Sequence, residues 1–380
     1  MDSTPADRSQ APDDVQAHDD VLGRRLGLSR RRLLAATTGI AAASAVPPMP
    51  GQAAAAHGPL IPRSRRGIIL FTVRDAISRD PRTTRLPSGF RQVFEALGEI
   101  GYERIEFAGY RQHANAQGGA DLETVKGARL LRSWLDDNGL RAEGNHGFIP
   151  PSWPLTRGDL DRFEQSLEIA GILGLSHMGT GADPTSSPYK ADWDVAADKW
   201  HRLGMIARRA GIRLYTHNHD AAYDFLLDSG PLDEQGRPTR SSGIRRLEYF
   251  LRISDPRYVF LEMDIFWAHV AQYKFTTFTA PDGSVRTDVF HPIRVVRRHE
   301  KRFPLFHAKD GRVNTDTPNG YDMVPFGTGD IDYGAFFGAL KRGRHYPMYE
   351  QDNAPGGAAD PGQSLEFADL SYDNMARLRS

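Results

Sequence analysis

Short apolar runs alternate with longer amphipathic segments from residue 67 to the end of the chain. The short runs are typical of parallel strands that are buried on both faces. The longer segments carry apolar residues at three- and four-residue spacing, as in Phe90, Val93, Phe94 and Leu97, which indicates helices with one buried face. This alternation predicts a repeated strand and helix fold around a parallel sheet.

Eight strand and helix pairs follow one another along the chain. The predicted strands are 67–73, 104–109, 140–146, 175–181, 212–218, 259–264, 304–310 and 346–351. Glycines stand between a helical segment and the next strand at Gly101, Gly139, Gly174 and Gly211, where they suit helix C-caps. Eight pairs over about 310 residues predict an α/β fold of the (β/α)8 TIM barrel class. A doubly wound open sheet is the alternative, but residues 72–75 after the first strand lack the glycine pattern of a dinucleotide site.

Two segments, 221–242 and 268–290, are longer than normal loops of this fold. Both leave predicted C-terminal strand ends, where long loops generally serve the substrate. We therefore expect walls or lids over a site, with decorative insertions as the alternative.

Residues 1–56 differ from the rest of the chain. Residues 1–28 are polar, rich in Pro and Asp and without periodicity, which predicts disorder. Arg30 and Arg31 then precede an alanine-rich, weakly apolar run to Val46 and a small-residue stretch ending at Ala56. This order predicts a twin-arginine export signal cleaved near Ala56, a periplasmic or secreted protein, and a barrel domain over 57–380. The apolar run is too short and too weakly apolar for a stable membrane span.

The composition excludes several kinds of site and partner. Of the 380 residues 25% are charged, the formal net charge is zero, and basic and acidic residues are mixed along the chain, which argues against a nucleic-acid partner. The chain has no cysteine, so disulfides, thiolate metal sites and cysteine nucleophiles are excluded.

Three apolar strands end in polar side chains. The strand 259–264 ends in Asp264, with Glu262 on the same side, and the next two strands end in His307 with Lys309 and in Glu350. The C-terminal ends of barrel strands meet at one face, so we expect Asp264, His307 and Glu350 to be partners there. Asp, His and Glu are ligand types for Mn²⁺, Zn²⁺ or Mg²⁺. The alternative is a helix cap at Asp264 and a core histidine at His307.

Other strand ends carry further candidates. In the fifth strand the period of two puts Tyr215, His217 and His219 on one side, so two imidazoles point into the mouth if that side faces the axis. Glu106 and His146 end the second and third strands and suit either hydroxyl binding and proton transfer or an ordinary place on the rim. Residues 327–332, GTGDID, superficially resemble a phosphate-binding turn, but aspartate at a helix start favours an N-cap.

From Gly67 onward the chain resembles the sugar phosphate isomerase/epimerase family, also called the xylose isomerase-like TIM barrels. The similarity lies in GIILFTVR at 67–74, IGYERIEFAGY at 100–110, HNHD at 217–220, LEMDIFW at 261–267, FHAKD at 306–310 and EQDN at 350–353. The resemblance implies a divalent metal held at strand ends by Asp264, His307 and Glu350. His217 stands where many epimerases have a glutamate, and relatives with this motif act on keto-sugars or keto-glycosides by β-elimination or hydration.

We therefore expect an exported, metal-dependent enzyme that abstracts a proton next to a carbonyl of a small sugar or keto-sugar. Isomerisation or epimerisation is the first choice, 3-keto-glycoside lyase or hydratase chemistry is the second, and a non-catalytic sugar-binding barrel is the alternative of another class. The metal would stabilise the enediolate. The expected metal ligands are His217, Asp264, His307 and Glu350. The expected base is Glu350, with Lys309 and His146 as alternatives, and the residues assigned to substrate binding are Glu106, His219 and Trp267.

Overall fold

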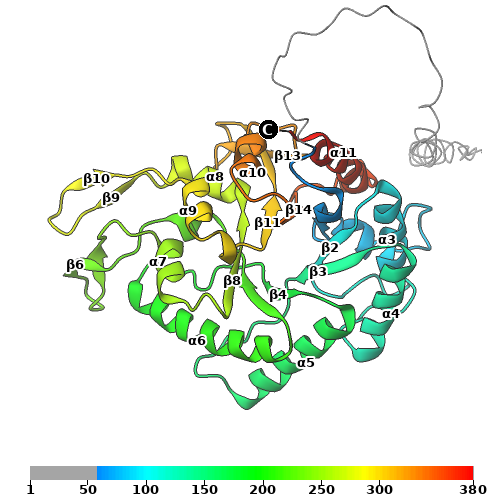
Figure 1. The fold of residues 1–380 in the computed structure, drawn as a ribbon, viewed down its shortest axis with the longest axis horizontal. Coiled ribbons are helices and arrows are strands. Elements are labelled where there is room, and N and C mark those ends of the chain that lie inside the picture. The colour runs from blue at the N-terminus through cyan, green and yellow to red at the C-terminus, as the bar shows by residue number, and fades with distance from the viewer. Residues whose placement is uncertain (1–57, 380) are drawn as a thin grey trace, which may run out of the picture.

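A computed structural model describes residues 58–379 of the chain. Eight parallel strands surround a central axis, and helices cover them on the outside (Figure 1). The predicted disordered N-terminus and export signal, residues 1–56, lie outside the described residues.

The barrel strands are β1 (Gly67–Ile69), β2 (Arg104–Phe107), β3 (Arg141–Asn145), β4 (His177–Thr180), β5 (Arg213–Thr216), β8 (Val259–Asp264), β11 (Leu305–Ala308) and β14 (Tyr346–Tyr349). Their hydrogen-bonded order is β3-β2-β1-β14-β11-β8-β5-β4. A parallel bridge between His146 and Gly179 joins β3 to β4 and closes the ring. The predicted (β/α)8 barrel is thus confirmed, and the open sheet is excluded. All eight predicted strands exist. Only 259–264 keeps its predicted bounds, because the other strands are shorter than predicted at one or both ends.

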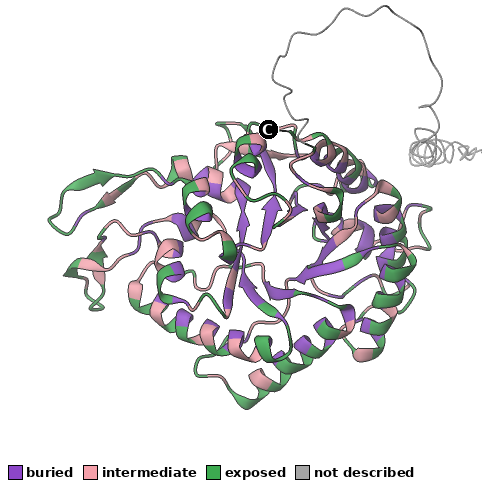
Figure 2. Ribbon diagram, viewed as in Figure 1, coloured by how far each residue is buried: buried purple, intermediate pink, exposed green. Residues whose placement is uncertain are grey.

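The helices are α2 (Arg74–Ser78), α3 (Gly89–Ile100), α4 (Val125–Asp137), α5 (Arg157–Leu173), α6 (Lys190–Arg209), α7 (Arg246–Ile253), α8 (Ile265–Lys274), α9 (Pro292–Arg298), α10 (Tyr333–Gly338) and α11 (Gln363–Arg377). Figure 2 shows buried strands inside and exposed outer faces on the helices. In α3 the predicted stripe of Phe90, Val93, Phe94 and Leu97 is buried. None of the helices in this part of the chain is long and apolar enough to cross a membrane.

Glycines end several helices, as predicted. Gly101 and Gly174 are C-caps in the left-handed region, with φ of 116° and 74°. Gly139 and Gly211 lie one residue beyond the C-caps of α4 and α6, also with positive φ. Positive φ favours glycine over residues with a Cβ atom. The predicted cap at 327–332 is also present, because the Asp332 side chain accepts a hydrogen bond from the Ala335 amide at the start of α10.

The two long segments fold into more structure than expected. Residues 221–242 contain most of the short helix η3 (Asp220–Tyr223) and a hairpin of β6 (Ser229–Leu232) and β7 (Pro238–Arg240). The prediction of a loop at 268–290 is wrong in its first part, because residues 268–274 complete α8. The apolar residues of that helix are spread around it and form no single stripe, so the sequence shows no helical periodicity there. The rest forms a second hairpin of β9 (Thr277–Thr279) and β10 (Val285–Thr287), which lies beside the first (Figure 1), joined by a bond from the Ser241 amide to the Thr279 carbonyl.

A buried arginine ties these insertions to the barrel. The guanidinium of Arg245 donates hydrogen bonds to the carbonyls of Tyr223 at 2.7 Å, Phe275 at 3.0 Å and Asp288 at 2.7 Å. We expect Arg245→Met to lower the free energy of unfolding by about 3 kcal/mol, because it leaves buried carbonyls without donors. Urea unfolding followed by circular dichroism measures this.

The matched control is Arg286→Met. Arg286 pairs with Asp282 at 2.9 Å in the same region but is exposed, so the expected change is below about 0.5 kcal/mol. Equal losses in both variants would show that Arg245 contributes no more than a surface ion pair.

Candidate active site

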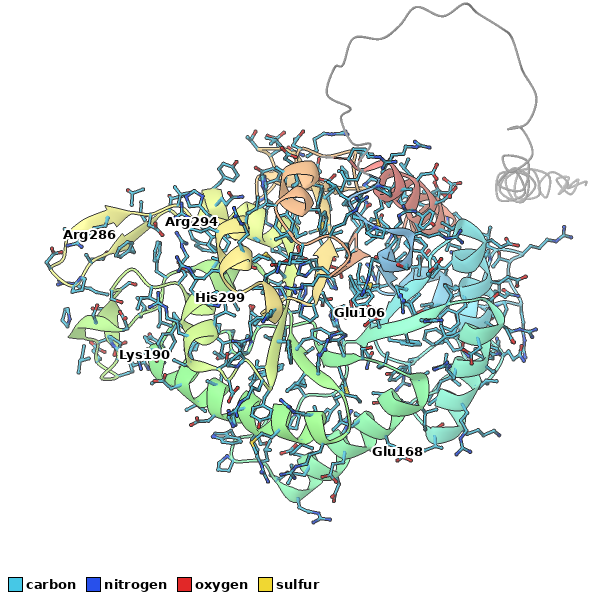
Figure 3. All side chains as sticks on the ribbon, in the orientation of Figure 1. Glu106, Glu168, Lys190, Arg286, Arg294 and His299 are labelled. Atoms are coloured by element: carbon cyan, nitrogen blue, oxygen red, sulfur yellow. The ribbon has the colours of Figure 1, made fainter. Side chains whose placement is uncertain are left out.

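The strand β8 supplies two acids to the inside of the barrel. Its side chains alternate, so Glu262 and Asp264 share the inward side, and both are fully buried. In the parallel register His307 on β11 is the partner of Asp264, and Met348 on β14 is the partner of His307. This register brings Glu350, two residues after Met348, to the same end of the barrel. Figure 3 shows Glu106 near the centre of the barrel, whereas Glu168 and Lys190 lie on the outer helices.

An upper group of charged side chains lies at the C-terminal mouth and consists of Asp264, Lys309, Glu350 and Asp352. Lys309 Nζ lies 3.0 Å from Asp264 Oδ2, 2.7 Å from Glu350 Oε2 and 3.0 Å from Asp352 Oδ1. The first three residues of the group are buried, and Asp352 is 35% exposed at the rim. A buried ammonium is stable here because three carboxylates surround it.

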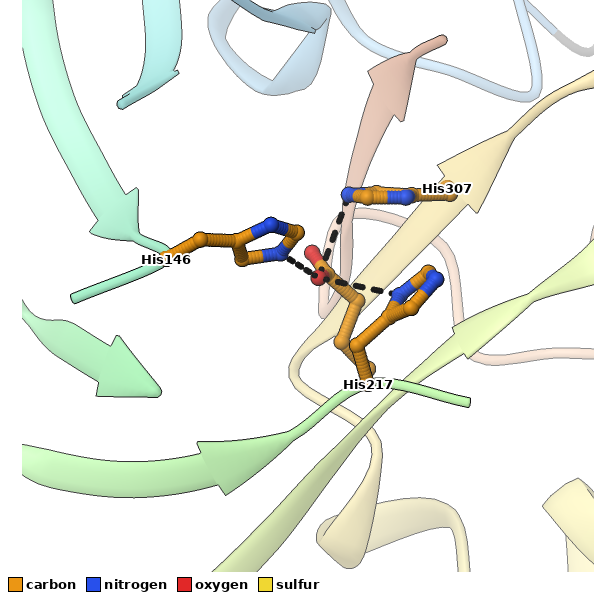
Figure 4. Close-up of side chains that lie close together, drawn as sticks. His146, His217 and His307 are labelled. Atoms are coloured by element: carbon orange, nitrogen blue, oxygen red, sulfur yellow. Dashed lines mark hydrogen bonds and ion pairs between the residues drawn. The ribbon is translucent and has the colours of Figure 1, made fainter. Parts of the chain in front are cut away.

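A lower group lies deeper and is centred on Glu262. Its Oε2 atom lies 3.0 Å from His146 Nε2, 3.1 Å from His307 Nε2 and 3.5 Å from His217 Nδ1, so three imidazoles face one carboxylate (Figure 4). Glu106 completes the lower group, because its Oε2 atom lies 3.2 Å from His307 Nε2 and Tyr215 donates a hydrogen bond to its other oxygen.

Two of these three imidazoles, those of His307 and His217, lie between Glu262 and the upper group. The Nδ1 atom of His307 lies 2.8 Å from Glu350 Oε2, on the ring edge opposite its contact with Glu262. The Nε2 atom of His217 lies 3.8 Å from Asp264 Oδ2, and its Nδ1 atom faces Glu262. Each ring therefore presents one nitrogen to each group.

Burial and neighbouring charges shift the pKa values of the buried acids in different directions. Burial, with Glu262 nearby, raises the pKa of Glu106 to about 7. Burial also raises the pKa of Asp264 to about 6, although Lys309 opposes this. For Glu262, burial favours the neutral acid, but the imidazoles of His307, His146 and His217 outweigh it and hold the pKa well below its usual range. The site thus keeps Glu262 charged more firmly than Glu106 or Asp264.

Two overlapping sets of described side chains can hold a metal ion. One contains Asp264, His307 and Glu350, and the other contains His146, His217, Glu262 and His307. In the first set Asp264 Oδ2, His307 Nδ1 and Glu350 Oε2 are all buried, and none has a partner in hydrogen-bond geometry, so their close contacts with one another and with Lys309 are ion pairs. In the second set His217 Nδ1 and Glu262 Oε1 also lack hydrogen-bond partners, but the His146 and Glu262 side chains already bond to each other. Buried polar atoms without hydrogen bonds are costly, so the first set, in which all three atoms lack them, fits a cation better.

The wall of the mouth contains aromatic side chains. The rings of His219 and Trp267 have centroids 5.8 Å apart, and Lys309 Nζ lies 5.7 Å from the Trp267 ring. The indole Nε1 of Trp267 is buried without a hydrogen-bond partner. Asp264 also positions this residue, because its Oδ1 atom accepts a hydrogen bond from the Trp267 amide as the N-cap of α8. Asp264 is therefore both a helix cap and a member of the charged cluster.

The structure brings most of the predicted site residues together. Asp264, Lys309 and Glu350 lie in the upper group, His217 and His307 lie between the groups, Glu106 and His146 belong to the deeper group, and His219 and Trp267 lie on the wall. No role was predicted for Glu262, which contacts three of these histidines. The available signal was a glutamate inside an apolar strand, two residues before Asp264 and on the same side.

A cavity of about 520 Å³ lies at the opposite end of the barrel, at the starts of β2 and β3. The charged side chains that line it include two pairs, Arg104 with Glu143 at 3.5 Å and Arg132 with Asp136 at 3.0 Å. Catalytic side chains of this fold gather at the C-terminal face of the barrel. The candidate active site is therefore the group of side chains at the mouth and not this cavity.

Comparison with known proteins agrees with this architecture. The family described as xylose isomerase-like TIM barrel matches residues 94–366. No curated protein shows significant sequence similarity to the chain. Among solved structures, a sugar phosphate isomerase/epimerase from Parabacteroides distasonis is 20% identical, with a TM-score of 0.56 over 87% of this chain and 99% of that one.

Two further solved structures are similar. Another sugar phosphate isomerase/epimerase from the same organism is 15% identical, with a TM-score of 0.56 over 81% of this chain and 96% of that one. A probable 3-DHS dehydratase from Bacillus anthracis is 13% identical, with a TM-score of 0.53 over 81% of this chain and 97% of that one. At these identities the likeness concerns the fold.

Proposed function

Because the chain belongs to the xylose isomerase-like TIM barrel family, we propose that it is a metal-dependent enzyme that abstracts a proton next to a carbonyl of a sugar or sugar derivative. The observation that carries the proposal is the convergence of Asp264 Oδ2, His307 Nδ1 and Glu350 Oε2, three buried atoms without hydrogen bonds, at the barrel mouth. Lys309 pairs with Asp264 and Glu350 but leaves all three atoms without a partner in hydrogen-bond geometry, which is uncommon for buried polar atoms of a purely structural cluster.

The proposed metal ligands are Asp264, His307 and Glu350, together with His217, whose Nε2 atom lies 3.8 Å from Asp264 Oδ2. Two imidazoles and two carboxylates suit Mn²⁺ or Zn²⁺ better than Mg²⁺, which prefers oxygen ligands. A bound divalent ion would supply positive charge for the oxyanion that develops when a proton leaves the carbon next to a carbonyl.

Glu350 is the proposed base. Burial alone would raise its pKa, but His307 and Lys309 outweigh burial and hold the pKa of Glu350 well below its usual range, so the carboxylate is charged and carries no proton. Burial opposes the charge of Lys309, but Asp264, Glu350 and Asp352 raise the pKa of Lys309 above its usual value. Lys309 therefore keeps its proton and suits hydrogen bonding to a substrate oxygen better than proton abstraction.

The reaction proposed first is isomerisation or epimerisation. A specific observation favours the second candidate, a lyase or hydratase acting on 3-keto-glycosides. Glu350 Oε2 and Lys309 Nζ lie 2.7 Å apart, so a base and a proton donor stand side by side. His217, directly after β5, also stands where many epimerases have a glutamate. β-Elimination needs one base and one acid for the leaving group, whereas epimerisation needs proton transfer on both faces of a carbon.

The proposed substrate is an uncharged sugar or keto-sugar. The indole of Trp267 and the imidazole of His219 offer an apolar surface with donor groups, which suits a sugar ring. The two cations next to Asp352 are already engaged, Lys309 with three acids and Arg74 with the Asp352 carbonyl at 2.7 Å. A phosphate would have to compete with these partners.

Turnover of sugars, sugar phosphates and 3-keto-glycosides with added Mn²⁺ tests the proposal. We expect conversion of an unphosphorylated compound and loss of that activity when a chelator removes the metal. Product analysis separates isomerisation from elimination. Stoichiometric sugar binding without conversion of any compound would instead support a non-catalytic sugar-binding barrel.

We also propose export by the twin-arginine route, on the basis of Arg30, Arg31 and the alanine-rich run that follows. A variant with Arg30→Lys and Arg31→Lys is expected to stay in the cytoplasmic fraction, whereas the wild type leaves it. Cell fractionation with immunoblotting measures this, and normal export of the double variant would contradict the proposal.

A further inference from the structure

We propose that Glu262 is a positioning residue that fixes the ring orientation and tautomer of His217 and His307. The inference rests on the proposed metal site, in which these two imidazoles are ligands. Glu262 would not touch the metal or the substrate, and it would act through the two histidines.

One oxygen atom of Glu262 contacts both histidines. Glu262 Oε2 lies 3.1 Å from His307 Nε2 and 3.5 Å from His217 Nδ1 (Figure 4). These are the ring nitrogens opposite those that face Glu350 and Asp264. An ionised carboxylate accepts hydrogen bonds only, so it favours N–H at both nitrogens that face it. The other nitrogen of each ring then carries the lone pair that a metal needs.

The lower group is suited to this task because its central carboxylate is buried and held by several contacts. Glu262 is fully buried at the centre of β8, with β5 on one side and β11 on the other. His146 Nε2 also bonds to Oε2 at 3.0 Å and so limits the rotation of the carboxylate. A fixed acceptor gives each imidazole one favourable ring orientation.

The two histidines depend on Glu262 to different degrees. His307 Nε2 has a second acceptor in Glu106 Oε2 at 3.2 Å, and the Tyr215 hydroxyl donates to Glu106 and holds it in place. The Nδ1 atom of His217 has Glu262 as its ion-pair partner in the described structure. Loss of the Glu262 carboxylate should therefore disturb His217 more than His307.

The test compares Glu262→Gln with Glu143→Gln. Glu143 is also a buried glutamate inside the barrel with a histidine partner, since His177 Nδ1 lies 3.3 Å from its Oε1 atom, but it lies near the opposite end. We expect Glu262→Gln to weaken Mn²⁺ binding by about 10- to 100-fold, the usual effect of losing an outer partner of a ligand histidine. Glu143→Gln is expected to change Mn²⁺ affinity less than about threefold.

Two measurements separate positioning from a general loss of structure. Electron paramagnetic resonance titration gives the Mn²⁺ affinity, and the visible absorption spectrum of the Co²⁺-loaded protein reports the ligand geometry. The Co²⁺ spectrum should change in Glu262→Gln and stay unchanged in Glu143→Gln. Glu262→Asp keeps the charge and should recover part of the affinity, and it serves as the test variant if Glu262→Gln does not fold.

Three results would overturn the inference. Wild-type affinity and an unchanged Co²⁺ spectrum in both Glu262 variants would show that the carboxylate does not position the ligands. Two metal ions per wild-type chain, with one lost in Glu262→Gln, would make Glu262 a ligand of a second metal. A wild-type protein that binds no metal would overturn the proposed function together with this inference, whereas the first two results leave metal-dependent chemistry intact.

Discussion

Glu350→Gln is expected to lower turnover by about 10²-fold or more, even when excess metal restores occupancy. Glutamine keeps the size of the side chain and one acceptor oxygen but loses the charge and the ability to take a proton. Glu350 Oε2 contacts His307 Nδ1 at 2.8 Å and Lys309 Nζ at 2.7 Å, so the geometry around the amide should stay close to that around the acid. The expected loss is the usual contribution of a general base. Steady-state kinetics over a range of Mn²⁺ concentrations measures it.

The matched control is Asp352→Asn. Asp352 also pairs with Lys309, at 3.0 Å, but it is partly exposed at the rim, so turnover should fall less than about tenfold. This control separates the loss of a base from the loss of one partner of Lys309. If excess metal restores most of the rate of Glu350→Gln, Glu350 is a ligand only, and His146 becomes the base to test.

Asp264→Asn and His307→Ala are each expected to weaken metal binding by more than about 100-fold while the protein stays folded. The loss should exceed the 10- to 100-fold effect of outer partners, because these side chains are proposed to contact the metal directly. Asparagine preserves the cap of α8, in which Asp264 Oδ1 accepts a hydrogen bond from the Trp267 amide. Metal analysis after loading with Mn²⁺ and removal of free ions measures occupancy, and circular dichroism measures folding.

Asp332→Asn is the control for the cap. Asp332 caps α10 through a 2.8 Å bond from the Ala335 amide and is itself exposed, so its replacement should leave metal content unchanged. Full occupancy in both Asp264→Asn and His307→Ala would contradict the proposed ligand set. Reduced occupancy in all three variants would mean that a general loss of structure, and not ligation, accounts for the loss.

The barrel was predictable because each strand and each helix leaves a local signal. Buried parallel strands are apolar along their length, and the outer helices show a stripe, as in α3. The helix α8 was missed in part because its apolar residues form no single stripe and because it follows β8 without a break. The hairpin of β12 (Asp310–Val313) and β13 (Tyr321–Val324) was missed because its polar residues 314–320 resemble an ordinary loop.

The proposed ligands were predictable for a related reason. Asp264, His307 and Glu350 each follow or end an apolar strand, and the C-terminal ends of barrel strands meet whatever their separation in sequence. The role of Glu262 could not be predicted in this way. Its three histidine partners follow β3 and β5 or lie on β11, and only closure of the ring and the register of the strands bring them around one oxygen.

The charge pattern at the mouth also depends on tertiary structure. Lys309 stood out in the sequence as a lysine at a strand end, which does not distinguish a base from a structural cation. The distances to Asp264, Glu350 and Asp352 show an ammonium among three carboxylates, and their charges raise the pKa of Lys309. These distances indicate that Lys309 is a candidate proton donor and not a candidate base.

Incorporation of solvent deuterium into the sugar tests metal-dependent proton abstraction most directly. The sugar or 3-keto-glycoside that the enzyme converts would be incubated in D₂O with the wild type, with and without Mn²⁺, and followed by ¹H NMR. We expect the proton next to the carbonyl to exchange only when metal is bound, and the exchange to fall by about 10²-fold or more in Glu350→Gln. Exchange that proceeds equally well after complete removal of the metal, or conversion of the sugar without any exchange or loss of that proton, would contradict the account.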